Sequence, residues 1–222
     1  MIQVENIEVF NIEGALRGMR NPLNSWKNAD TAREASPFGA PPIPKIGEND
    51  MRLAQRLLAA GSDHAKFLRQ IGVCMDITAP IYWWKEMDTY KVGTTANSTS
   101  TMHKIAAKPF ERKDFSFDNE ELPLAVIQNV TVWRFDDFIE NVLKYCEKLR
   151  QLYLETGDKR YWRALIQMLP SAYNQRRTWT ANYAVLRNIY FARKNHKLTE
   201  WHDFCHMIEN LPYGKELICF GE

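Results

Sequence analysis

The 222-residue sequence contains no uninterrupted apolar stretch near the ~20 residues that a membrane-spanning helix requires. At its start it also lacks the basic segment followed by an apolar segment that marks a secretion signal. Its four cysteines form no Cys-x-x-Cys pair, which argues against a zinc knuckle or a dithiol redox motif. We therefore expect a cytoplasmic protein with no membrane contact and with its cysteines as thiols.

The chain also lacks a strong excess of charge of either sign. Its 29 lysines and arginines nearly balance 27 aspartates and glutamates, which leaves a formal net charge of +2. A dedicated polyanion binder carries a large positive excess, so there is no strong nucleic-acid signal, although a local basic patch is compatible with this balance. The 45% hydrophobic content is that of a globular protein. Without internal repeats, we expect a single domain over residues 1–222, with a loop-rich segment at 21–48.

Hydrophobic periodicity predicts roughly four strands and six helices that do not strictly alternate, which favours an α+β or mixed α/β fold. The main predicted strands cover residues 2–10, 73–77 and 173–180, and the aromatic segment 81–84 is expected to be buried. Predicted helices cover 15–19, 49–60, 136–156, 159–168, 183–193 and 199–211, with a further helix start near residue 63. Gly61 and Gly157 are expected to end two helices, and Asn182 to cap another.

The stretch from Leu169 to Arg193 combines a turn, a strand and a helix. Pro170 ends the preceding helix, and the residues after it suit a half-buried strand. On the helix that follows, Asn188 and Arg193 lie outside the apolar positions, roughly 140° apart around the axis. Such a strand and helix can present both side chains to an anionic ligand. The alternative is two solvated helix residues.

Two further groups of residues are candidates for a metal site and a phosphate site. His202 and His206 have the spacing of metal ligands on one helix, but no third ligand is evident, and we expect them to flank a core-packed helix with no metal. A basic group surrounds the Leu-Pro turn, and it is either a solvated surface or a phosphate site, since arginine forks suit phosphate oxygens. Its members are Lys159, Arg160, Arg163, Arg176 and Arg177.

The segment from Tyr90 to His103 resembles the signature of the flavin-dependent thymidylate synthases. That signature is Arg-His-Arg, two residues, Ser, one residue, Asn-Glu, one residue, Ser, one residue, Arg-Tyr. Asn97 and Ser100 are identical to it at the same spacing, and Thr95 stands for its first Ser. The resemblance covers residues 49–104 and 160–211. In the second range, the matching residues are Leu169, Pro170, Trp179, Thr180, Asn182, Leu186, Asn188 and Arg193.

This resemblance implies a flavin-dependent thymidylate synthase-like fold, with a central, mostly antiparallel sheet flanked by helices. It implies a homotetramer that binds FAD and dUMP at subunit interfaces and uses NADPH and methylenetetrahydrofolate to make dTMP. By position, Ser100 and Arg193 would bind the pyrimidine nucleotide, and Arg193 would be catalytic by stabilising negative charge on its ring. Asn97, Asn188 and Lys91 would belong to the flavin site, with Asn97 holding its loop in shape. The resemblance thus predicts that the two polar segments share one pocket, across a subunit boundary.

Several charged positions of the signature are replaced. Arg-His-Arg becomes Tyr-Lys-Val at residues 90–92, or Lys-Val-Gly at 91–93, and the closing Arg-Tyr becomes Met-His at 102–103. Ser98 replaces the glutamate, and Ile166 stands where an arginine precedes Leu-Pro. Each lost charge-assisted hydrogen bond is worth about 1.5–3 kcal/mol. Three hypotheses follow: a divergent enzyme that methylates or alkylates a pyrimidine nucleotide, an inactive homologue that binds a nucleotide or a macromolecule, and an interaction subunit of a true synthase.

Overall fold

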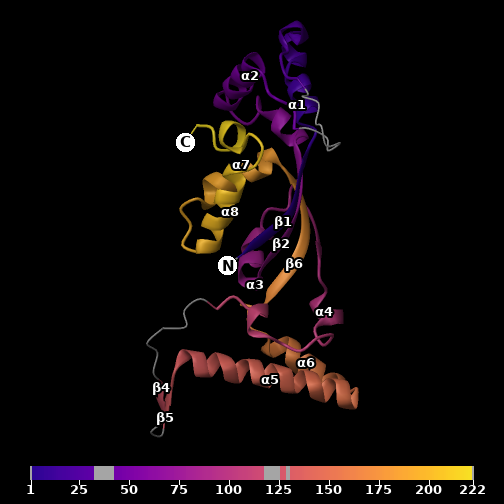
Figure 1. Cartoon of the computed structure of the whole chain (residues 1–222), viewed down its shortest axis with the longest axis vertical. Coiled ribbons are helices and arrows are strands. Elements are labelled where there is room, and N and C mark those ends of the chain that lie inside the picture. The colour runs from indigo at the N-terminus through magenta and orange to yellow at the C-terminus, as the bar shows by residue number, and fades with distance from the viewer. Residues whose placement is uncertain (1, 33–42, 118–125, 129–130, 222) are drawn as a thin grey trace. The chain divides into compact units, whose positions relative to one another are not determined.

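The computed structural model describes residues 2–32, 43–117, 126–128 and 131–221 (Figure 1). The chain forms two compact units. The first unit contains Thr78–Met87 and Ser98–Arg177, and the second contains Ile2–Ile77, Asp88–Asn97 and Thr178–Glu222. The expectation of a single domain over 1–222 stays a prediction. Residues 33–42 of the expected loop-rich segment lie outside the described residues.

A four-stranded sheet has the strand order β1-β2-β6-β3. Its inner strands are β2 (Gly72–Pro80) and β6 (Asn174–Asn182), and its edges are β1 (Gln3–Phe10) and β3 (Thr95–Ser98). β2 buries alternate residues from Val73 to Ala79 because the side chains of a strand point to opposite faces in turn. The antiparallel sheet with accompanying helices confirms the predicted mixed fold class. β3 was not predicted, because all four of its residues are exposed and leave no apolar alternation in the sequence.

The helices of the second unit begin and end close to the predicted positions. They are α1 (Ile12–Met19), α2 (Glu48–Ala59), α7 (Tyr183–Arg193) and α8 (Thr199–Glu209). Short helical turns at η1 (Asn21–Leu23), η2 (Trp26–Asn28), η3 (Lys66–Gln70) and η5 (Gly214–Ile218) complete the unit. The helix predicted to start near residue 63 is present as a 3-10 helix, η3, which begins three residues later than expected. α7 contacts α8, η3 and η5, and its Leu186 and Ile189 are completely buried.

Two helices of the second unit are capped by side chains. Asn182 accepts a 3.1 Å hydrogen bond from the backbone N–H of Val185, which confirms the predicted N-cap of α7. The N-terminus of α2 is capped from a distant loop, where Asp30 accepts from the backbone N–H groups of Asn49 and Asp50 at 2.8 and 3.0 Å. α2 ends before Gly61, which has φ +105°, as the sequence predicted.

The first unit contains the longest helix, α5 (Phe135–Thr156), which packs against α6 (Lys159–Met168). The bounds of both helices match the prediction within one residue, and Gly157 ends α5 with φ +68°. The unit also contains α3 (Ile81–Met87), α4 (Thr101–Lys104), η4 (Arg112–Asp114) and the antiparallel pair β4 (Val126–Gln128) and β5 (Thr131–Trp133). Trp83 and Trp84 of α3 are buried, as expected for the aromatic segment. Among the described helices, none combines the length and apolarity needed to cross a membrane.

Candidate functional site

Arg193, the last residue of α7, lies among aromatic side chains. Its Nε donates a 2.9 Å hydrogen bond to the Oη of Tyr90. Its guanidinium carbon lies 5.6 Å from the centre of the Tyr90 ring and 4.8 Å from the centre of the Trp201 ring. Trp201 is fully buried on α8, and the two rings meet edge to face at 6.3 Å. Two segments outside α7, the turn at Tyr90 and the helix α8, therefore fix the orientation of this permanent charge.

The turn from Tyr90 to Thr94 approaches the other end of the same helix. Thr94 Oγ1 donates a 2.6 Å hydrogen bond to the backbone oxygen of Tyr90. Gly93 has φ +75°, and a Cβ atom there would lie 3.1 Å from Nδ2 of Asn182 and 3.5 Å from Cγ2 of Val185. The turn therefore meets the start of α7 through Gly93 and its end through Tyr90. Two residues 103 positions apart in the sequence, Tyr90 and Arg193, are brought together here. That Asn97 and Ser100 share a pocket with Asn188 and Arg193 stays a prediction.

The residues predicted to bind flavin are all exposed. Lys91 lies in the turn beside Tyr90, Asn97 lies on the edge strand β3, and Asn188 lies within α7. Carboxamides both donate and accept hydrogen bonds, and an ammonium group attracts phosphate. This donor set fits the polar edge of a flavin ring and its pyrophosphate. Convergence of these three side chains on one pocket stays a prediction.

Ser100 lies in the first unit, where it caps α4. Its Oγ accepts a 3.1 Å hydrogen bond from the backbone N–H of His103. The preceding residue, Thr99, donates from its backbone N–H to the backbone oxygen of Arg176 at 2.9 Å. Gln175 donates from its side chain to the backbone oxygen of Thr99, also at 2.9 Å. This part of the signature is therefore tied to the chain around β6, and the Ser100 hydroxyl retains its capacity to donate.

Two members of the basic group around the Leu-Pro turn, Arg160 and Arg177, make side-chain contacts within the first unit. The guanidinium of Arg177 lies 4.1 Å from the centre of the Trp84 ring, and its Nε donates to Oε1 of Gln175 at 2.9 Å. Arg160 forms a 2.6 Å ion pair with Asp158. The Arg160 guanidinium holds the pKa of that carboxyl below its ordinary value. These contacts favour a structural surface over a phosphate site.

The two histidines of α8 contact neighbouring groups. His202 Nε2 lies 2.7 Å from the backbone oxygen of His196, and His206 Nδ1 lies 3.5 Å from a carboxylate oxygen of Glu209. Within the described ranges, no group of three or more histidines, cysteines, aspartates or glutamates is arranged to hold a metal ion. All four cysteines are thiols, as expected, and burial raises the pKa of the Cys205 thiol to about 12.

Two partners of Arg193 were missed by the sequence reasoning. In one of the two alignments given above, Tyr90 replaces the first arginine of the signature, and the sequence then shows only the loss of a cation. Trp201 lies within the helix predicted over residues 199–211, and its side chain is buried. Its position beside a guanidinium depends on the packing of α8 against α7, which the sequence pattern does not encode.

No family model and no curated protein matches the sequence. Solved structures do match. Thymidylate synthase X (ThyX) from Helicobacter pylori, with FAD and dUMP, gives a TM-score of 0.67 at 17% identity, over 100% of both chains. A flavin-dependent thymidylate synthase ThyX structure from Helicobacter pylori, complexed with FAD and dUMP, gives 0.63 at 16% identity, over 96% of this chain and 98% of that chain.

The third matching structure is that of a nucleotide methylase. The UMP/dUMP methylase PolB from Streptomyces cacaoi, bound with 5-Br dUMP, gives a TM-score of 0.63 at 13% identity. The match covers 100% of this chain and 96% of that chain. The chain therefore has the flavin-dependent thymidylate synthase-like fold, which confirms the fold that the resemblance predicted.

Proposed function

We propose that this chain is a divergent flavin-dependent thymidylate synthase-like protein that binds a pyrimidine nucleotide of the dUMP type. The observation that carries the proposal is the position of Arg193, held by Tyr90 and Trp201 where the helix α7 meets the turn of the degenerate signature. The full-length fold match to proteins solved with dUMP supports it. Ser100 is proposed as a second contact to the nucleotide.

Arg193 is proposed to act on the pyrimidine ring. A guanidinium keeps its charge at any physiological pH and holds its donors in a fixed plane. Because the hydrogen bond to Tyr90 and the two rings orient it in advance, little reorganisation is needed when negative charge develops on the ring. Stabilising that charge would activate a ring carbon for methylation or alkylation.

The flavin is proposed to bind at Asn97, Asn188 and Lys91. Bound FAD would supply the transfer of a methylene group from methylenetetrahydrofolate, with NADPH as the reductant. The residues of this chain would supply binding, orientation and electrostatics. The carboxamides of Asn97 and Asn188 would contact the ring edge, and the ammonium of Lys91 would contact phosphate. We propose that the site is completed in a homotetramer.

A second candidate function is a catalytically inactive homologue that binds a nucleotide or acts as an interaction protein. The specific observation in its favour is that the Nε of Arg193 donates to Tyr90 of the same chain. In the alignment that places residues 90–92 at Arg-His-Arg, an aromatic residue replaces an arginine and binds the catalytic candidate Arg193.

Flavin binding separates the two functions. A divergent enzyme is expected to purify yellow, or to quench the fluorescence of added FAD in a saturable titration. A colourless protein that leaves FAD fluorescence unchanged would contradict the enzyme and favour the inactive homologue. Thermal unfolding with dUMP, dTMP and dCMP then tests nucleotide binding, since a ligand that binds only the folded state raises the Tm. No shift with any of the three would remove the nucleotide from the proposal.

A further inference from the structure

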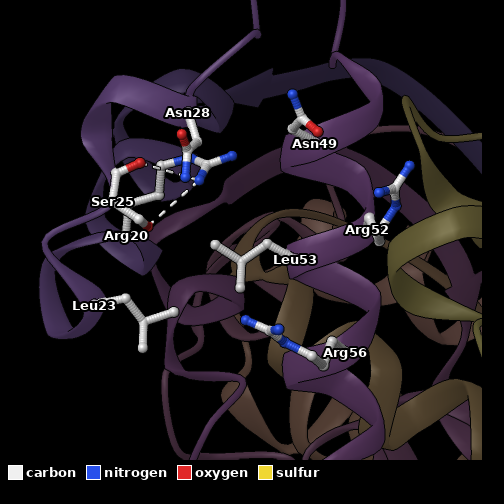
Figure 2. A pocket seen from close by; sticks show the side chains of 8 residues that line it. All are labelled: Arg20, Leu23, Ser25, Asn28, Asn49, Arg52, Leu53 and Arg56. Carbon is white, nitrogen blue, oxygen red and sulfur yellow. Dashed lines mark hydrogen bonds between the residues drawn. The ribbon is translucent and has the colours of Figure 1, made fainter.

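A cavity of about 320 Å³ lies in the second unit, between α2 and the turns η1 and η2 (Figure 2). Its polar lining consists of Arg20, Asn28, Asn49, Arg52 and Arg56, together with Ser25. Among the described residues, no acidic side chain lines it. Its volume is within the range of small-ligand pockets. The cavity therefore combines space for a small molecule with a concentrated positive charge in a chain whose net charge is only +2.

Arg20 is the buried member of this lining, with 3% of its surface exposed. Its Nε donates a 2.6 Å hydrogen bond to Oδ1 of Asp50, and its Nη1 donates to the backbone oxygen of Ser25 at 3.2 Å. Its Nη2 is buried and has no hydrogen-bond partner in the described part of the chain. Figure 2 shows the guanidinium directed from the loop toward α2. Buried polar groups are almost always paired, so this atom indicates a missing acceptor.

Asp50 does not supply that acceptor, because its oxygens are already engaged. Oδ1 accepts from Arg20, and Oδ2 accepts from the backbone N–H of Thr31 at 2.9 Å and from its hydroxyl at 2.6 Å. The backbone N–H of Asp30 donates to the same oxygen at 3.1 Å. The charges of Arg20 and Asp50 therefore balance each other. The Nη2 group of Arg20 still has no hydrogen-bond acceptor among the described residues.

Arg52 and Arg56 add two cations on the same side of α2. They are four residues apart, so their side chains are neighbours on the helix surface, where like charges destabilise a helix. Both residues are exposed, and Figure 2 shows the Arg56 side chain extending across the cavity toward Leu23. A bound anion would offset this repulsion and would reach the Arg20 side of the cavity.

We propose that this cavity binds the phosphate group of a small phosphorylated molecule. Arg52 and Arg56 would provide guanidinium donors to the phosphate oxygens, and Arg20 Nη2 would find its acceptor there. The carboxamides of Asn28 and Asn49 would contact the remainder of the molecule, for which the cavity is large enough. None of these residues belongs to the nucleotide or flavin sites proposed above, so the inference stands independently of the proposed function.

The test is a calorimetric titration of the full chain with inorganic phosphate and with pyrophosphate, at an ionic strength held constant with chloride. Saturable binding is expected for the wild type. The double variant Arg52→Gln/Arg56→Gln is expected to weaken it at least about tenfold, since two charge-assisted contacts are lost. The double variant Arg17→Gln/Arg69→Gln removes the same charge from exposed positions of the same unit outside the lining, and should change the affinity less than about twofold.

Two further variants test whether phosphate binds in this cavity or at the site proposed for the pyrimidine nucleotide. Arg20→Lys keeps a cation for Asp50 but lacks Nη2, so it should weaken phosphate binding while the circular dichroism spectrum stays unchanged. Arg193→Ala should leave phosphate binding intact even where it abolishes the response to dUMP. The proposal is overturned if wild-type binding does not saturate, if both double variants weaken it equally, or if Arg193→Ala removes it.

Discussion

At the scale of single residues, the molecule contains two arginines whose surroundings fix them in place. Arg193 is held by a hydrogen bond and by two aromatic faces at the end of α7. Each cation–π contact contributes about 0.5–2 kcal/mol, depending on how far the pair is desolvated. Arg20 is held by Asp50 in the interior of the second unit. The first arginine is the candidate for nucleotide chemistry, and the second anchors the cavity beside α2.

Replacing Arg193 with alanine tests the nucleotide site directly. We expect Arg193→Ala to abolish any rise in Tm that dUMP produces, because this variant removes the charge proposed to face the pyrimidine ring. Lys197→Ala serves as the control, since Lys197 is an exposed cation in the segment that follows α7. A dUMP response that is the same in Arg193→Ala and in the wild type would exclude Arg193 from the site.

Replacing Asp50 with asparagine tests the buried ion pair. Burial acts to raise the pKa of Asp50, but hydrogen bonds from Thr31, Arg20 and the backbone outweigh it and hold this pKa below its ordinary value. A depressed folded-state pKa stabilises the fold above the unfolded-state pKa, and this contribution is lost as the pH falls through the folded-state value. Asp50→Asn should therefore lower the free energy of unfolding at pH 7 by roughly 3–5 kcal/mol, since Arg20 loses its counter-charge.

Urea denaturation from pH 7 down to pH 3 provides the measurement for this variant. The wild type should lose stability below about pH 4, and the difference between wild type and Asp50→Asn should narrow over the same interval. A difference that stays constant with pH would show that the carboxylate charge is not what stabilises the fold.

At the scale of elements, the contact between the signature turn and α7 depends on a glycine. Gly93 has φ +75°, and a Cβ atom added to it would lie only 3.1 Å from the side chain of the cap residue Asn182. Gly61 has φ +105°, and a Cβ atom added there would have nothing within 4 Å. Both glycines are in the left-handed region, which costs a residue with a Cβ roughly 1–2 kcal/mol. Only Gly93 also faces a close neighbour.

The two glycines form a matched pair for mutation. We expect Gly93→Ala to lower the free energy of unfolding by about 1 kcal/mol more than Gly61→Ala, because the added methyl group crowds the helix cap. Urea denaturation of both variants measures the difference. Equal losses in the two variants would mean that the turn does not depend on close approach to α7.

At the scale of the whole molecule, the proposed homotetramer can be tested through one exposed surface. α5 exposes Phe138 and Tyr145, which are seven residues apart and therefore on the same side of the helix. Leu154 is equally exposed but nine residues beyond Tyr145, on the opposite side. Large apolar groups aligned on one side of an exposed helix are typical of a docking surface.

We expect light scattering to give a mass four times the 26.0 kDa of one chain. Phe138→Glu/Tyr145→Glu should reduce this mass, because two charges would be buried in the interface. Leu154→Glu, on the other side of α5, should leave it unchanged. A wild-type mass of one chain would contradict the proposed homotetramer.

Local signals in the sequence determined the helices, and the signature determined which fold to expect. α5, α6 and α7 were predicted within one residue because a helix that packs on a core repeats its apolar side chains along the chain. Gly157 correctly predicted the end of α5 and Asn182 the start of α7, because a capping residue acts on the adjacent turn of the helix. Ser100 and Arg193 were selected as site residues through the resemblance to the family, and their roles stay predictions.

The tertiary structure alone decided which partners those residues meet. Tyr90 lies 103 residues from Arg193, and Asp30 caps α2 from a separate loop. β3 is a strand only because β6 pairs with it, since its own side chains are all exposed. These features depend on chain segments that meet after folding, and a repeating pattern records only which side of an element faces the core. For that reason the sequence predicted the main helices and the inner strands, while the edge strand β3 and the contacts between segments came from the fold.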